Sequence, residues 1–335
     1  MRYDIRVDKA DIAAFDVDGV VCLRQVFDPS MIGRLAEALD ELGGGIPDSQ
    51  AGYDLTTMRR KIFTSDADGV HDGAAQQHDI GAIATAIRAS GARALLDTQS
   101  EDVGHFQLDT STWRRNAVVR ELVLDSTLPQ IAAQLLRANK VNYCDDQIFL
   151  KAPQTVDRTA FHQDYTYFRM RGWRGCVMWI CVDEADEAAG ALAYVRGSHR
   201  WGKEFLPNVF MAQVGMPGGS GASLEDIENN PEKFDLIRYE TKPGDIIIHH
   251  FLTVHGAGGN HSSHPRRALS VRYAGEDMVY YSRPGAPEQP YQRHQLGEGD
   301  PLDSEAYPVV WPRPYPGFRL AGLYSDRSSP PPPSA

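Results

Sequence analysis

The feature that most constrains the fold is a series of short apolar segments between residues 139 and 277, separated by Gly, Pro and Asp turns. Segments of this length with turn residues at both ends predict β-strands. They lie at 141–151, 159–168, 176–183, 191–195, 234–239, 245–251 and 267–274. The segment at 176–183, CVMWICVD, is too apolar to have a solvent-facing side. We therefore predict a mainly β protein with flanking helices and a closed or double-layer β architecture. Among such architectures, the jelly roll is the one that places side chains from distant strands around one cavity.

The region before residue 139 is predicted to be helical. The clearest helix spans 28–42, where Asp28 is a suitable N-cap and Pro29 a suitable first residue. Further helices are expected at 80–90, 112–124 and 128–138, and residues 46–79 are expected to form an irregular insertion or short helices. We expect a single domain over 1–327, with a helical part at about 28–138, a jelly-roll core at about 139–277 and a Pro/Tyr-rich wrap at 278–327. Residues 328–335, with four consecutive prolines, are expected to form a disordered tail.

Composition excludes several classes of function. The chain has 335 residues, of which 42% are hydrophobic and 24% charged, as in soluble globular proteins. A net charge of -11 argues against nucleic-acid or membrane partners, and no apolar run reaches the roughly 18 residues of a membrane span. The N-terminus lacks the apolar centre of a signal peptide, and the 4 cysteines have no zinc-like spacing. We expect a cytoplasmic monomer or homodimer with reduced thiols and a small-molecule substrate.

Two segments carry candidate metal ligands. If 159–168 is a strand, His162 and Asp164 project to the same side of it. A second histidine, His255, opens a loop between two predicted strands in 244–272. Two histidines and one carboxylate that leave open positions are typical of non-haem Fe(II) oxygenases. His249 and His250 are rival ligands, but they lie inside the preceding predicted strand.

Several motifs together resemble a known family. They are HQD at 162–164, a W-I-x-V-D run ending at Asp183, GAL at 190, GSH at 197, PGD at 243, and HGAGGN followed by RRALSVRYAGED. In this order they resemble the phytanoyl-CoA dioxygenase superfamily, which consists of Fe(II)- and 2-oxoglutarate-dependent oxygenases on a double-stranded β-helix. The resemblance covers about 12–277 and is strongest from Asp146 onward.

The resemblance implies roles for individual residues. His162, Asp164 and His255 match the catalytic metal ligands, and Arg266 matches the arginine that binds the distal carboxylate of 2-oxoglutarate. Trp179 matches a tryptophan that lines the co-substrate pocket. The implied cofactors are Fe(II), 2-oxoglutarate and O2.

Strand alternation supports Arg266 over its neighbour Arg267. One face of the predicted strand is small or polar, and the other is mainly apolar and suited to packing against outer helices. The polar face contains Arg266, Ala268, Ser270 and Arg272, and the apolar face contains Arg267, Leu269, Val271 and Tyr273. We expect the polar face, with Arg266 and Ser270, to line the cavity.

Other pocket candidates follow from position alone. Gln147 and Lys151 share one side of a predicted strand and are candidates to contact 2-oxoglutarate or substrate. An aromatic wall for the substrate is predicted from Tyr143, Tyr165, Tyr167 and Phe168. The Gly- and Pro-rich segment 206–229 is a candidate lid over the cavity.

Three functions stay open at this point. The resemblance implies hydroxylation of a small organic molecule, a natural-product intermediate or catabolite, with an acyl-CoA as the alternative substrate; the intact carboxylate of Asp164 favours hydroxylation over halogenation. The segment FDVDGVVCL at 15–23 is predicted to be a strand, and an apolar strand that runs into Asp-x-Asp-Gly is also how haloacid-dehalogenase-like phosphatases present a nucleophile, here Asp16. The preferred interpretation is that Asp18-Gly19 is a turn before an edge strand. The third is a metal-binding β-barrel without turnover.

Overall fold

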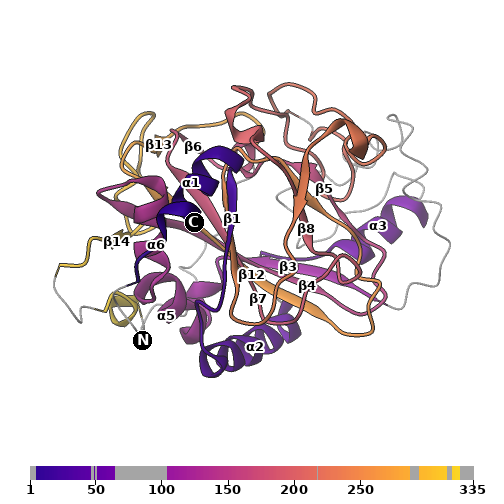
Figure 1. The fold of residues 1–335 in the computed structure, drawn as a ribbon, viewed down its shortest axis with the longest axis horizontal. Helices are drawn as coiled ribbons and strands as arrows, with labels where there is room; N and C mark the ends of the chain where they lie inside the picture. Colours follow the sequence, from indigo (N-terminus) through magenta and orange to yellow (C-terminus); the bar gives the residue numbers. More distant parts are fainter. Residues whose placement is uncertain are drawn as a thin grey trace, which may run out of the picture.

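The computed structural model describes residues 5–46, 49, 51–64, 104–216, 218–286, 294–314 and 319–324, and within them two antiparallel sheets face each other (Figure 1). The larger sheet has the order β1 (Val20–Leu23), β10 (Ile246–His250), β7 (Gly175–Cys181), β12 (Arg266–Gly275), β4 (Val141–Lys151), β3 (Phe106–Thr110) and β2 (Gly52–Asp54), with β14 (Val309–Trp311) paired to β4. The smaller sheet is β5 (Thr159–His162), β11 (His255–Ala257), β8 (Leu192–Val195) and β9 (Leu236–Arg238). A separate pair joins β13 (Val279–Tyr280) to β6 (Met170–Arg171). The predicted jelly roll is confirmed.

Helices precede and flank the strands. They are α1 (Lys9–Asp18), α2 (Pro29–Gly44), α3 (Leu55–Thr64), α5 (Ala117–Asp125) and α6 (Leu128–Leu136), with short 3-10 helices η3 (Thr112–Arg114), η4 (Asp164–Tyr167), η5 (Ser198–Arg200), η6 (Pro231–Lys233) and η7 (Ala321–Tyr324). No helix in the described ranges combines the length and apolar character needed to cross a membrane. The helix predicted at 80–90 lies outside the described residues.

Local sequence sets the helix starts. Asp28 caps α2 by accepting a hydrogen bond from the Met31 amide at 2.9 Å, as predicted. The helix predicted at 112–124 is divided, because the Asn116 side chain accepts hydrogen bonds from the amides of Val118 and Val119 and so begins α5. The helix predicted at 128–138 is α6.

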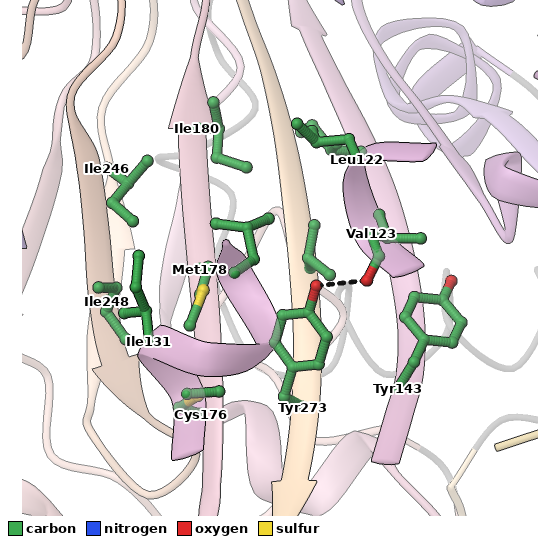
Figure 2. Close-up of a cluster of buried hydrophobic side chains, with 14 of the residues drawn as sticks. Leu122, Val123, Ile131, Tyr143, Cys176, Met178, Ile180, Ile246, Ile248 and Tyr273 are labelled. Carbon is green, nitrogen blue, oxygen red and sulfur yellow. Dashed lines mark hydrogen bonds between the residues drawn. The ribbon is translucent and has the colours of Figure 1, made fainter. Parts of the chain in front are cut away.

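The main core lies between the larger sheet and the helices. Helices α2, α5 and α6 cover one face of this sheet (Figure 1). Alternate residues of β1, β10, β7 and β12 pack against these helices. Figure 2 shows this packing with side chains of β7, β10 and β12 beside those of α5 and α6. The remaining residues of β7, including Trp179, point between the sheets. Burial on both faces explains why this strand has no polar side.

The strand predicted over 15–23 is wrong for residues 15–19. Residues up to Asp18 belong to α1, Gly19 ends the helix with φ 76, and the strand begins at Val20. Asp16 and Asp18 therefore lie on a helix and form ion pairs with Arg137 and Arg196. The phosphatase hypothesis required Asp16 on a strand of a parallel sheet, and the described strands pair antiparallel.

A comparison of two separate buried tyrosines tests how the sheet is fixed to the helices. The Tyr273 hydroxyl on β12 donates a hydrogen bond of 2.7 Å to the Val123 carbonyl on α5 (Figure 2). Tyr273→Phe removes this bond and should lower the free energy of unfolding by about 1 kcal/mol in urea denaturation. Tyr194→Phe is the matched control, because the equally buried Tyr194 hydroxyl has no partner in the described part of the chain. Equal losses in both variants would contradict this account.

Candidate active site

A cavity of about 180 Å³ lies between the two sheets and contains the predicted ligand triad. One ligand atom from each of His162, Asp164 and His255 lies within 4.8 Å of the other two, and all three residues are buried. They come from the end of β5, the start of η4 and the start of β11. Three convergent donors of these types can hold a metal ion and leave coordination positions open.

Strand pairing brings the two histidines together. His255 is the register partner of His162 in the antiparallel pair β11–β5, and their ring centroids lie 4.4 Å apart. His255 opens a strand instead of the predicted loop. The strand predicted over 159–168 ends at His162, because η4 begins at Asp164. Gln163 between them keeps an extended backbone, with φ -105 and ψ 138, so both side chains still reach the same cavity.

Hydrogen bonds to the backbone fix which imidazole nitrogen is available. Nδ1 of His162 lies 2.8 Å from the Ala160 carbonyl, and Nδ1 of His255 lies 3.0 Å from the Thr253 carbonyl. A carbonyl only accepts, so each Nδ1 carries the proton and each Nε2 keeps a lone pair. Burial, with the neighbouring histidine second, lowers the pKa of both rings to about 4. Both imidazoles are therefore neutral near pH 7, as metal ligands must be.

The carboxylate of Asp164 is held at both oxygens. Oδ2 accepts a hydrogen bond of 3.0 Å from His249 Nε2, and Oδ1 lies 3.4 Å from Arg272 Nη2. Burial alone would raise the pKa of Asp164, but the hydrogen bond from His249 and the charge of Arg272 hold it well below its usual range. Asp164 is thus an anion before any metal binds.

His249 and His250 occupy opposite sides of β10. His249 lines the cavity, whereas His250 Nε2 donates to the Trp173 carbonyl at 2.7 Å. His249 is therefore a partner of the Asp164 carboxylate, and His250 has a structural hydrogen bond outside the cavity. Strand alternation was the available signal, because Ile247 and His249 share the side opposite the helix-packed Ile246 and Ile248.

One end of the cavity fits a carboxylate. Arg266 is buried there, with its guanidinium carbon 5.6 Å from the Trp179 ring centroid and Ser270 on the same strand face. The Arg266 Nε atom has no hydrogen-bond partner in the described ranges. A buried, unpartnered guanidinium nitrogen is suited to a carboxylate ligand such as that of 2-oxoglutarate. Arg267 lies on the opposite face and pairs with Asp183 and with Asp40 of α2.

Lys151 does not line the cavity. Its Nζ donates to the Gly258 carbonyl at 2.5 Å and lies 4.4 Å from the Phe106 ring centroid. Burial, and then the nearby charge of Arg266, hold its pKa well below the usual range. Gln147, predicted with it, does line the cavity, where its Oε1 accepts from Arg272 Nη2 at 3.1 Å.

Two of the four residues predicted to form an aromatic wall line the cavity. Tyr167 and Phe168 line the cavity. Tyr143 does not, because the register of β12 against β4 shifts there: Arg272 is opposite Asp145 and Tyr273 opposite Tyr143. This bulge turns Tyr143 toward the helices, where its hydroxyl donates to Asp146. Tyr165 belongs to a separate core cluster and accepts a hydrogen bond from the Gly172 amide.

The outer wall of the cavity is apolar, and it comes partly from the predicted lid segment and partly from residues for which no cavity role was predicted. The residues that form it are Tyr53, Leu55, Met58, Leu108, Phe149, Val209, Phe210, Met211 and Met216. Of these, 209–211 and 216 belong to the predicted lid segment. Phe210 has φ 62, stacks on Phe149 with centroids 6.0 Å apart, and accepts a hydrogen bond from the Ala160 amide through its carbonyl. The segment is thereby fixed beside His162.

A jelly roll with two histidines and one carboxylate around a buried cavity defines the class of non-haem Fe(II) oxygenases. A family model described as phytanoyl-CoA dioxygenase (PhyH) matches residues 15–268, and the chain belongs to this family.

Comparison with individual proteins supports the same fold. A probable phytanoyl-CoA dioxygenase from Caenorhabditis elegans is 30% identical over 127 residues, which is 38% of this chain and 39% of that protein, so the chain matches only about two fifths of this relative. The carbocyclase SnoK from nogalamycin biosynthesis, a non-heme alpha ketoglutarate dependent enzyme, has a TM-score of 0.60 at 20% identity and covers 91% of this chain and 96% of its own. The epimerase SnoN, solved with Fe3+, alpha ketoglutarate and nogalamycin RO, has a TM-score of 0.57 at 19% identity, over 90% of this chain and 98% of its own.

The contact between His249 and Asp164 predicts that two variants of His249 differ in their affinity for Fe(II). His249→Leu removes the donor to the metal-ligand carboxylate and should weaken Fe(II) binding about 10-fold, whereas His249→Gln keeps an N–H donor and should retain most of the affinity. Competition with a coloured Fe(II) chelator under anaerobic conditions measures both. If the Leu and Gln variants bind Fe(II) equally well, the hydrogen bond has no role in metal binding.

Proposed function

We propose that this protein is an Fe(II)- and 2-oxoglutarate-dependent dioxygenase that hydroxylates an unactivated C–H bond of a small organic molecule. The observation that carries this proposal is the buried His162, Asp164 and His255 cluster. It shares one cavity with Arg266, whose Nε has no hydrogen-bond partner among the described residues. Family membership and the fold of the solved neighbours support the same reaction class.

Different residues of the cavity would bind the metal and the co-substrate. His162 and His255 would bind Fe(II) through Nε2, and Asp164 would bind it as a carboxylate already free of its proton. Arg266 would hold the distal carboxylate of 2-oxoglutarate. Bound Fe(II), 2-oxoglutarate and O2 together supply the oxidising chemistry, with succinate and CO2 released. The chain's contribution is to orient the ligands and to exclude water with apolar walls.

A compact substrate fits the cavity better than an acyl-CoA thioester. Several of the relatives are named for a CoA thioester, whose phosphates call for cationic partners. Among the described residues that line the cavity, the cations are Arg266 and Arg272, and both are buried in its interior. The outer wall is apolar. This lining supports a small, largely apolar molecule that enters the cavity whole.

Anaerobic titration with Fe(II) and 2-oxoglutarate tests the proposed function. A visible charge-transfer band should appear and should be lost in His255→Ala, because the metal then lacks one ligand. His264→Ala is the control, since this histidine is exposed in the loop after β11. A candidate substrate should then accelerate succinate release and gain one oxygen atom by mass. Absence of the band excludes the oxygenase, and a band without substrate-accelerated turnover favours the non-catalytic β-barrel.

The role of Arg266 predicts a selective defect in co-substrate binding. Arg266→Gln loses charge-assisted hydrogen bonds worth about 3 kcal/mol and should raise the KM for 2-oxoglutarate about 100-fold in a succinate assay. Fe(II) affinity should change little. Arg267→Gln is the matched control on the same strand, because its guanidinium faces Asp183 and Asp40 on the outside of the sheet. An unchanged KM in Arg266→Gln would assign the distal carboxylate to another residue.

A further inference from the structure

Two buried residues of opposite charge face the cavity but form no ion pair with each other. Arg272 and Asp145 are register partners on β12 and β4, and both line the cavity. Their exposed fractions are 4% and 2%. Yet Asp145 Oδ1 accepts from the Ser111 hydroxyl at 3.1 Å, and Arg272 Nη2 is directed at Gln147 and Asp164. The pair therefore forms no ion pair of its own, although adjacent strands would allow one.

The Arg272 guanidinium can donate more hydrogen bonds than it makes within the described residues. Its Nε and Nη1 atoms are buried and have no hydrogen-bond partner within the described residues. The Phe168 ring, whose centroid lies 5.0 Å from the guanidinium carbon, restricts the plane of the group. Buried N–H donors are almost always paired in folded proteins. A group that occupies the cavity beside Arg272 must therefore supply an acceptor.

The position of Asp145 limits the charge of that group. An anion bound to Arg272 would lie close to the Asp145 carboxylate, and a cation bound to Asp145 would lie close to the Arg272 guanidinium. Burial raises the pKa of Asp145 to about 7, while the charge of Arg272 opposes the rise, so the carboxyl is ionised in mildly alkaline solution. An uncharged group with an acceptor for Arg272 and a donor for Asp145 satisfies both partners.

The rest of the lining describes the body of the ligand. Phe168 lies against Arg272, and the lining of the same cavity also includes the aromatic side chains of Phe149 and Phe210 and the thioethers of Met58, Met211 and Met216. Flat or bulky apolar surfaces pack well against aromatic rings and flexible methionines. The site thus combines one two-point polar contact with a broad apolar wall.

We propose that Asp145 and Arg272 form a substrate subsite for an uncharged head group of the amide type, with acceptor and donor on neighbouring atoms, on an aromatic or apolar body. This inference rests on the proposed function, since it places the head group beside the metal ligand Asp164. Within the reaction, Asp145 and Arg272 are specificity-determining residues, and their side chains select an uncharged head over a carboxylate of the same shape.

Three matched probes test the subsite in the anaerobic holoenzyme with Fe(II) and 2-oxoglutarate bound. They are 2-naphthamide, methyl 2-naphthoate and 2-naphthoate, titrated by calorimetry at pH 8, where Asp145 is ionised. The amide supplies both an acceptor and a donor, the ester only acceptors, and the acid a negative charge. We expect the amide to bind at least 10-fold more tightly than either of the others.

Variants separate the two contacts. Arg272→Gln should weaken binding of the amide at least 10-fold. Asp145→Asn keeps the shape and removes the negative charge, so binding of 2-naphthoate should tighten at least 10-fold. Arg267→Gln, on the opposite face of β12, should leave the order of the three probes unchanged. The isosteric Asp145→Asn variant keeps the test decisive if Arg272→Gln fails to fold.

Several outcomes would overturn the proposal. They are tightest binding of 2-naphthoate to the native protein, equal or undetectable binding of all three probes, and a probe order that Asp145→Asn does not change. Weaker Fe(II) binding in Arg272→Gln with an unchanged probe order would confine Arg272 to holding Asp164. The charge-transfer band reports on the proposed function separately, because it forms before any probe is added.

Discussion

Burial of one face of the larger sheet against α2, α5 and α6 is the constraint on which the site depends. Leu269, Val271 and Tyr273 occupy that face on β12, so the intervening residues must point between the sheets. A register slip of one residue would exchange the two sets and move both cavity arginines to the helix side. The helices therefore position the active site without contributing a side chain to the triad. Apolar packing on one side of a strand fixes the chemistry on the other.

The inner face of the same sheet is built with groups that do not favour folding. Within the described residues, Arg266 and Arg272 retain nitrogen atoms that have no hydrogen-bond partner, and Asp145 is buried without an ion-pair partner. Buried polar groups left unpaired oppose folding, so their concentration at one cavity marks a binding site. The apolar core under the helices offsets this cost. Ligands that complete the missing hydrogen bonds would stabilise the folded protein as they bind.

Much of this arrangement was predictable because alternation is a local property of a strand. The apolar runs gave β4, β7, β10 and β12 nearly to the residue, and parity correctly separated Arg266 from Arg267. The prediction for Tyr143 was wrong because a bulge in β4 changes parity, and no residue type in VNYCDDQ indicates one. The strand predicted over FDVD was wrong, because an apolar run of that length fits either a strand or a helix. Part of the outer wall comes from the loop at 209–216, whose position depends on tertiary contacts such as Phe210 on Phe149.

The two cavity arginines lie at separate positions along one strand. Arg266 and Arg272 are six residues apart on the same face of β12, which separates their α-carbons by roughly 20 Å at about 3.3 Å per residue. Arg266 lies with Trp179 and Ser270, and Arg272 lies with Asp164, Gln147 and Phe168. The metal-ligand carboxylate is thus in contact with the second arginine and away from the first. This separation allows a dicarboxylic acid to be held at one end of the cavity while the other end remains free to select the molecule that is oxidised.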